Sequence, residues 1–168
     1  QVYQIGNIKA LIDFLSTGKR VDLIFNMAEG RYGRARESQI PGILDAYQIP
    51  YTFSDPLTLA ICLDKGLTKK ILQKEKIPTP EFIVLEPDAP IEHKIQYPLF
   101  IKPLYEGTSK GIDENAIIQK EEDLITRTKW LWEEYKQPVL VEKYLPGREF
   151  TVGILGTGKD AHVLGMME

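Results

Sequence analysis

The stretch 98–111, which reads PLFIKPLYEGTSKG, constrains this chain more than any other feature of its sequence. A short apolar run ends in Lys102, and a loop rich in Gly, Thr and Ser follows it. A lysine at an apolar strand position is costly to bury unless it is paired or hydrated. Loops that offer backbone amides and hydroxyls, here those of Thr108 and Ser109, bind phosphate groups. The stretch therefore predicts a strand that carries a cation to the edge of a phosphate-binding loop.

Neither half of this pattern is specific by itself. An edge lysine whose ammonium group reaches solvent would also explain Lys102, and loops of Gly and Ser are common. The spacing of a Walker A loop is absent. A second glycine-rich stretch, 156–158, loosely resembles a dinucleotide-binding motif, but it falls in a predicted hairpin turn. The phosphate-binding hypothesis therefore depends on what the rest of the chain supplies.

The composition excludes several classes of protein. A chain of 168 residues with 43% hydrophobic and 27% charged residues is long enough for one domain, or two small ones, with a packed core. The net charge of −3 argues against binding to nucleic acid by phosphate neutralisation. No apolar run approaches the roughly 20 residues of a membrane span, and the start lacks the pattern of a secretory leader. We therefore expect neither nucleic acid nor a membrane among the partners.

The single cysteine, Cys62, lies among Ala60, Ile61 and Leu63. It has no second cysteine with which to form an internal disulfide, and its apolar neighbours predict that the thiol is buried. A buried free thiol is typical of a protein from a reducing compartment. We therefore expect a cytoplasmic protein.

The apolar residues recur at helical spacing over 5–15, 41–47 and 121–136. Two more helical runs begin after Asp55 and at Asp64, each with an oxygen-bearing side chain at its start. In the second of these runs Leu67, Ile71 and Leu72 are the apolar positions, whereas Lys69 counts among the polar ones. This pattern predicts an amphipathic helix whose leucines and isoleucine face the core.

Apolar runs predict strands over 21–25, 82–85, 98–102 and 138–144, and a terminal hairpin of two strands over 149–155 and 162–167. The helix at 5–15 followed by the run at 21–25 indicates a buried strand of a parallel sheet. Ligands of open α/β sheets bind at the carboxyl ends of such strands, so Glu29, in the loop that follows, is a candidate on the substrate side. A charged loop in solvent explains Glu29 equally well.

The order of these features resembles the ATP-grasp fold, specifically its D-alanine–D-alanine ligase-like branch. Lys65 begins a helical run, Lys102 ends a strand before the Gly/Ser loop, and VEKYLPGRE spans 141–149. Two further stretches, 49–54 and 77–80, carry the same likeness. The resemblance implies an α/β (α+β) chain: a remnant of a parallel-sheet N-terminal domain over 1–61, the small ATP-grasp subdomain over 62–145 and the start of the large subdomain over 146–168.

By this resemblance the site is one for ATP, and its phosphate side has four candidate residues. Lys65 and Lys102 would contact the phosphates, and Thr108 and Ser109 would lie in the loop that closes over them. From the residues alone, Lys65 is equally well explained as a surface lysine.

The resemblance places four more residues on the nucleoside side. Glu142 would face the adenine amino group, and Lys143 and Leu145 would bind adenine through their backbone groups. Glu149 would hold the ribose. A pair of acidic residues at the two ends of a β-turn explains Glu142 and Glu149 without a nucleotide.

The chain departs from the family pattern in two places. Glu29 stands where the family usually has a histidine, so D-alanine as the substrate does not follow from the resemblance. The later half of the family, which carries the magnesium ligands, has no counterpart up to Glu168. We therefore expect no metal ligand in this chain, and ATP with Mg²⁺ only in the full enzyme.

The family reaction joins a carboxylate to an amine through an acyl phosphate. The resemblance thus implies the ATP-binding part of an ATP-dependent carboxylate–amine ligase whose substrates are small, amino-acid or dipeptide-like molecules. We expect this chain to be inactive alone and to self-associate through surfaces left uncovered. Two alternatives remain: a non-catalytic nucleotide-binding or interaction module, and a fragment without a function of its own.

Overall fold

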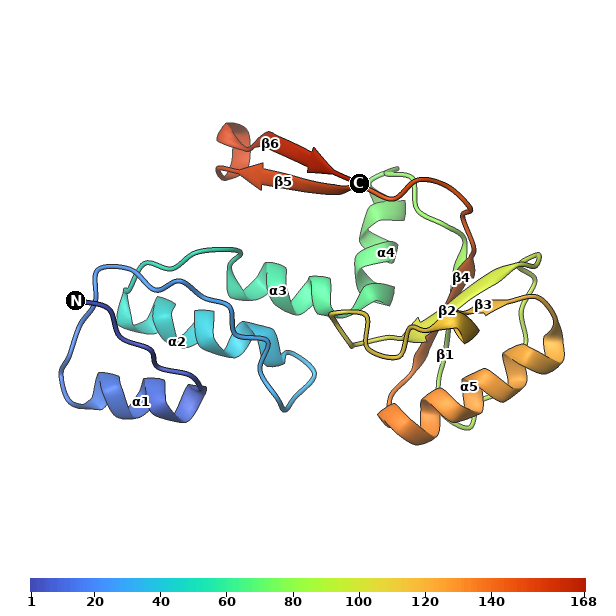
Figure 1. The fold of residues 1–168 in the computed structure, drawn as a ribbon, viewed down its shortest axis with the longest axis horizontal. Helices are drawn as coiled ribbons and strands as arrows, with labels where there is room; N and C mark the ends of the chain where they lie inside the picture. The colour runs from blue at the N-terminus through green and yellow to red at the C-terminus, as the bar shows by residue number, and fades with distance from the viewer.

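The computed structural model describes residues 1–168. It divides the apolar core into two separate clusters, one formed by the N-terminal segments and one by a four-stranded sheet and its covering helix. Figure 1 shows these two parts side by side, with a separate two-stranded hairpin that lies above α3 in this view. No helix has the length and apolar character needed to cross a membrane.

The N-terminal part is built from α1 (Ile8–Ser16), the short 3-10 helix η1 (Arg36–Ser38) and α2 (Gln39–Tyr47). The side chain of Asn7 caps α1 by accepting a hydrogen bond from the amide of Ala10 at 3.0 Å. The two α-helices share one buried cluster with the segment that follows α2. It consists of Leu11 and Leu15 of α1, Ile40 and Leu44 of α2, and Ile49. The helices expected over 5–15 and 41–47 are thus confirmed, with starts that differ by two or three residues.

The buried strand expected over 21–25 is wrong. Only Ile24 forms a β-bridge, to Tyr51, and this bridge is parallel as expected. Leu23 and Phe25 are exposed, because no second strand and no helix covers the outer side of this segment. Parallel strands are stable mainly when both faces are covered, and this segment is covered on one side only.

The helices α3 (Pro56–Leu63) and α4 (Lys65–Lys74) connect the two parts (Figure 1). Asp55 caps α3 by accepting from the amides of Leu57 and Thr58 at 2.9 and 3.0 Å. Asp64 caps α4 by accepting from the amide of Leu67 at 2.9 Å. Both caps confirm the helix starts expected from the sequence.

The inward face of α4 is not the one that the apolar pattern predicts. Leu67 and Ile71 are exposed, whereas Gly66 and Lys69 are buried. A Cβ added to Gly66 would lie 3.0 Å from a methyl carbon of Val84, so the glycine lets the helix approach the sheet closely. Lys69 can be buried there because it pairs with a carboxylate.

The expectation that Cys62 is buried is also wrong. The free thiol of Cys62 is exposed, because α3 packs only part of its surface against η1, α2 and α4. The argument that placed this protein in a reducing compartment therefore loses its basis in a buried cysteine.

The second part is an antiparallel sheet with the strand order β1-β4-β2-β3. Its strands are β1 (Phe82–Leu85), β2 (Leu99–Pro103), β3 (Ile117–Ile118), which follows the short 3-10 helix η2 (Glu114–Ala116), and β4 (Val139–Lys143). The helix α5 (Glu121–Tyr135) covers one face of the sheet. Alternate residues of the strands pack beneath it with Leu124 and Leu131: Leu85, Leu99, Ile101, Ile118, Val139 and Val141. The strands and the helix expected here are confirmed.

The chain ends in the expected hairpin of β5 (Thr151–Leu155) and β6 (His162–Met167), joined by the 3-10 helix η3 (Gly158–Asp160). It forms a sheet of its own, and every residue from Leu145 onward is exposed. The exposed side chains include seven large apolar ones: Val152, Ile154, Leu155, Val163, Leu164, Met166 and Met167.

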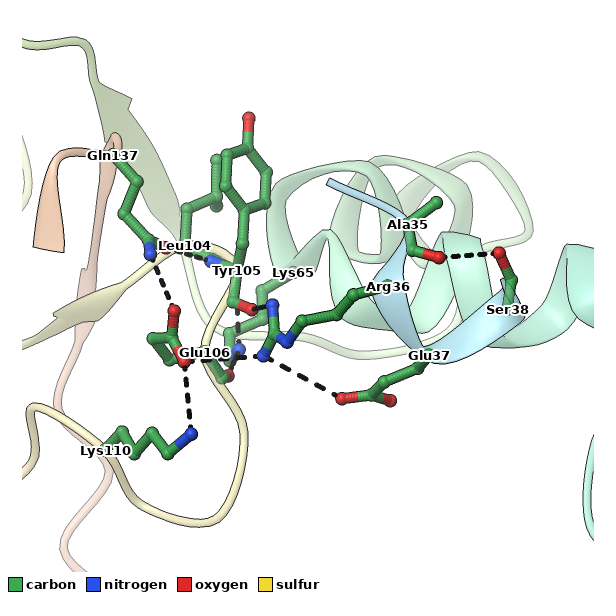
Figure 2. A network of polar contacts seen from close by, with 10 residues as sticks. All are labelled: Ala35, Arg36, Glu37, Ser38, Lys65, Leu104, Tyr105, Glu106, Lys110 and Gln137. Carbon is green, nitrogen blue, oxygen red and sulfur yellow. Dashed lines mark hydrogen bonds and ion pairs between the residues drawn. The ribbon is translucent and has the colours of Figure 1, made fainter. Parts of the chain in front are cut away.

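A buried arginine joins the N-terminal part to the segment after β2 (Figure 2). The guanidinium group of Arg36 donates to the carbonyl oxygen of Tyr105 at 2.8 Å and lies 3.4 Å from the carboxylate of Glu106. The other oxygen of Glu106 accepts from Gln137 at 2.9 Å. These contacts link residues about 70 positions apart in the chain and hold the two parts together.

Replacing Arg36 with methionine should destabilise the fold. The substitution leaves the Tyr105 carbonyl without its side-chain donor and removes the Arg36 contact of the Glu106 carboxylate, which keeps Gln137 and Lys110. Hydrogen bonds to charged groups contribute about 1.5–3 kcal/mol each. We expect a loss of about 3 kcal/mol in the free energy of unfolding, measured by urea denaturation. Arg31→Met is the matched control, because Arg31 is exposed and makes no ion pair. Equal denaturation midpoints for the two variants would show that the Arg36 contacts contribute nothing to the stability of the fold.

Candidate functional site

The sheet face that α5 leaves open carries the residues expected to bind a nucleotide. Glu142 on β4 lies directly opposite Phe82 on β1 and Phe100 on β2, so the three side chains form a row on one face. Lys102 lies two residues beyond Phe100 and points to the same face. Side chains alternate between the two faces along a strand. The alternation that buries Leu99 and Ile101 under α5 thus places Lys102 on the opposite face, beside Glu142.

Glu142 forms ion pairs with two lysines from different elements. Its Oε1 lies 2.7 Å from the Nζ of Lys102, and its Oε2 lies 2.6 Å from the Nζ of Lys69 on α4. All three side chains are at least four-fifths buried. Burial raises the pKa of Glu142, but the hydrogen bonds and charges of Lys102 and Lys69 outweigh it and lower the pKa below its ordinary value. The carboxylate is therefore ionised at neutral pH.

Lys65 is the first residue of α4. Its Nζ contacts two backbone carbonyl oxygens, those of Leu104 and Glu106 (Figure 2). Burial and the neighbouring charge of Lys102 lower the pKa of Lys65. Two ammonium groups, those of Lys69 and Lys102, thus share the single carboxylate of Glu142. This leaves a surplus of positive charge, which suits a polyanion.

The loop after β2 has a strained tip. Thr108 and Ser109 adopt φ angles of 49° and 60°, in the left-handed region, and the amide of Lys110 closes the turn on the carbonyl of Gly107 at 3.1 Å. Neither hydroxyl forms a hydrogen bond within the chain, and both residues are exposed. Strain of this kind in an exposed loop is typical of functional sites.

The two ends of this loop are fixed. Arg127 donates to the carbonyl of Gly111 at 3.1 Å and lies 3.0 Å from Asp113. At the other end, the Arg36 contacts hold Tyr105 and Glu106. The loop is therefore anchored at its base on both sides, and its tip, with its two free hydroxyls, is left in solvent.

The nucleoside-side candidates are only partly brought together. The Nζ of Lys143 donates to the carbonyls of Gln96 and Tyr97 at 3.0 and 3.1 Å, so its charge is used within the fold. Leu145 is exposed, and its amide makes no backbone hydrogen bond. Glu149 is exposed ahead of the hairpin and makes no ion pair with Lys65, Lys102 or Lys69.

Glu29 is exposed in the N-terminal loop and makes no ion pair. No contact joins it to Lys102 or Glu142. Nearby, Arg34 lies 2.7 Å from Asp64, the cap of α4, so this loop does reach the start of the helix that carries Lys65. The assignment of Glu29 to the substrate side stays a prediction.

Sequence reasoning missed Lys69 and Arg36. Lys69 lies four residues after Lys65, so both lysines share one face of α4, and this spacing was the available signal. Arg36 gave no local signal, because its partners Tyr105 and Glu106 are distant in the sequence. In both cases a buried charge is explained only by a partner that the tertiary fold supplies.

No group of three or more His, Cys, Asp or Glu side chains in the chain could hold a metal ion.

Comparisons with known proteins identify relatives of this chain. A family model described as the D-Ala–D-Ala ligase C-terminus matches residues 71–168. A D-alanine–D-alanine ligase of Rhodospirillum rubrum is 35% identical over 142 residues, which cover 83% of this chain and 45% of the relative. The corresponding ligase of Agrobacterium fabrum is 34% identical over 168 residues, covering 96% of this chain and 49% of the relative.

Solved structures show the same fold. The D-alanine–D-alanine ligase of Bacillus anthracis complexed with ATP is 26% identical, with a TM-score of 0.68 over 92% of this chain and 56% of that chain. The VanG D-Ala:D-Ser ligase of Enterococcus faecalis is also 26% identical, with a TM-score of 0.69 over 87% of this chain and 42% of that chain.

This chain spans about half the length of the curated relatives that it matches. The fold is that of the first part of an ATP-grasp protein, and the family model covers more than half of the 168 residues. The chain therefore belongs to the D-alanine–D-alanine ligase family.

Proposed function

We propose that this chain is the ATP-binding part of an ATP-dependent carboxylate–amine ligase. The observation that carries the proposal is the cluster on the open sheet face, where Lys102 and Lys69 pair with the buried Glu142. The fixed carboxylate would accept a hydrogen bond from the amino group of the adenine base. The surplus of positive charge would attract the polyphosphate at the other end of ATP.

On the phosphate side, Lys65 and Lys102 supply positive charge from a partly dry surface, where charge is worth more than in water. The hydroxyls and amides of Thr108 and Ser109 are donors that the fold itself does not use. They are the groups that we assign to the phosphates.

On the base side, Glu142 would accept from the adenine amino group. The rings of Phe100 and Tyr144 lie 6.3 Å apart and nearly parallel on the same face, so they offer an apolar surface beside the carboxylate. The backbone groups of Lys143 and Leu145 would complete the adenine site, and Glu149 would bind the ribose.

In the whole protein, the reaction proposed is that of the family. ATP transfers its terminal phosphoryl group to a substrate carboxylate, which gives ADP and an acyl phosphate. The amine then displaces phosphate, loses a proton and forms the amide. The residues present here position ATP; the proposal assigns no magnesium ligand and no phosphoryl-transfer step to this chain.

The substrates proposed are a small carboxylate and a small amine of the amino-acid or dipeptide-like class. The relatives include a D-Ala:D-Ser ligase as well as D-alanine–D-alanine ligases, so the second substrate differs between relatives. Glu29 in place of the usual histidine is our reason to leave D-alanine unassigned.

Two further expectations stay predictions. The exposed apolar side chains of the β5–β6 hairpin offer a surface for self-association. A cytoplasmic location rests on the sequence and the family, since Cys62 no longer supports it.

The ATP site can be tested by isothermal titration calorimetry. We expect Lys102→Met to weaken ATP binding at least about tenfold, or ~1.4 kcal/mol, because it removes a phosphate contact. Lys129→Met on the outer face of α5 is the matched control and should bind as the unchanged chain does, since Lys129 is exposed and unpaired. Equal affinity of the Lys102 and Lys129 variants would remove Lys102 from the site.

A turnover assay separates the ligase from the alternative, a non-catalytic nucleotide-binding module. We expect no amide product and no ADP release from this chain alone, and both from the full-length protein supplied with amino acids, ATP and Mg²⁺. ATP binding by the full-length protein without any ADP release across the twenty amino acids and their D-forms would favour the module.

The strained loop tip predicts opposite effects on stability and binding. Ser109→Gly should raise the free energy of unfolding by about 1 kcal/mol, because glycine adopts φ 60° without the steric cost of a Cβ. The same substitution should weaken ATP binding, because it removes a phosphate donor. Ser109→Ala is the matched control: it removes the hydroxyl but keeps the Cβ, so it should weaken binding without stabilising the fold. Unchanged ATP affinity in both variants would exclude the hydroxyl from the site.

A further inference from the structure

Lys69 and Lys102 bind the same carboxylate, but they are held very differently. The Nζ of Lys69 donates to Thr79 at 2.7 Å, lies 5.2 Å from the centre of the Phe82 ring and pairs with Oε2 of Glu142 at 2.6 Å. Its side chain is 10% exposed. Three contacts on three sides therefore fix its ammonium group.

Lys102 has fewer constraints. Its Nζ lies 5.3 Å from the centre of the Phe100 ring, but apart from Oε1 of Glu142 it has no hydrogen-bond acceptor. Its side chain is 20% exposed, twice the value for Lys69. Lys102 can therefore leave Glu142 without breaking another hydrogen bond, whereas Lys69 would also lose its bond to Thr79.

This asymmetry matters because the proposed function requires Lys102 to contact a phosphate, whereas in this structure its Nζ is held by Oε1 of Glu142. In this exchange Oε1 loses its lysine and offers its lone pairs to the adenine amino group. Removing the only partner of a buried carboxylate is strongly destabilising. The exchange is therefore feasible only if a second cation stays on Oε2.

We propose that Lys69 is a positioning residue of the nucleotide site: it keeps Glu142 charged and oriented while Lys102 moves from Glu142 to a phosphate. The inference rests on the proposed function, because it requires a nucleotide that draws Lys102 away. Lys69 itself touches no substrate in this scheme and acts through Glu142 alone.

The first test measures base selectivity by calorimetry with ATP and inosine triphosphate. Inosine carries a carbonyl oxygen where adenine carries the amino group, so a well-placed Glu142 should favour ATP at least about tenfold. We expect Lys69→Met to bring the ATP-to-inosine-triphosphate affinity ratio close to one, and Lys69→Arg, which keeps the charge, to restore part of it. Lys70→Met, on the exposed side of the same helix, should leave the ratio unchanged.

A merely structural role would weaken both nucleotides equally. An unchanged affinity ratio in Lys69→Met would therefore overturn the inference, even if both affinities fell. If the unchanged chain bound ATP and inosine triphosphate equally well, the adenine assignment of Glu142 would itself be wrong. No binding of either nucleotide would reject the proposed function.

A second test does not depend on nucleotide binding. With one lysine removed, the other still compensates Glu142, so Lys69→Met and Lys102→Met should each lower the urea midpoint modestly. The double variant should lose more than the sum of the two shifts, and adding Glu142→Gln should recover part of the loss. Additive shifts would show that the two lysines do not share the carboxylate and would overturn the inference.

Discussion

Burying the carboxylate of Glu142 is the constraint on which the rest of this structure depends. A charge on an antiparallel sheet face, opposite two phenylalanines, is tolerable only with cations close by. The strand β2 supplies one, Lys102, by the alternation that buries its neighbours under α5. The second cation, Lys69, comes from α4, outside the sheet. The pairing of Lys69 with Glu142 therefore determines which face of α4 is buried against the sheet.

A second buried charge, Arg36, connects the two parts of the chain. Its partners, the Tyr105 carbonyl and Glu106, lie where β2 gives way to the Gly/Ser loop, and Lys65 contacts the Glu106 carbonyl from the other side. The base of the loop is therefore fixed by residues of both parts, and only its tip is free. A change in the N-terminal loop that carries Arg34 and Arg36 would reach the phosphate side of the site through these contacts.

The sequence was sufficient wherever the determinants were local. The caps Asp55 and Asp64, the alternation of β2 and the terminal hairpin all follow from neighbouring residues, and the structure confirms them. The errors share one cause. The segment 21–25 lacks the cover that a parallel strand needs, Cys62 lies on a helix that is only partly packed, and the buried face of α4 depends on Glu142, 73 residues after Lys69. The local pattern of apolar residues does not indicate whether a segment distant in the sequence will cover a side chain or pair with it.

The helix α4 serves both ends of the candidate site through one face. Lys65 and Lys69 are four residues apart, which is about 6 Å along a helix axis. The first reaches the carbonyls at the base of the loop, and the second reaches Glu142 on the sheet. Because both lysines project from one rigid element that Gly66 seats against Val84, a rotation that exposed either lysine would displace both. The positions of the phosphate side and of the base side are thus set together, by a single helix–sheet contact.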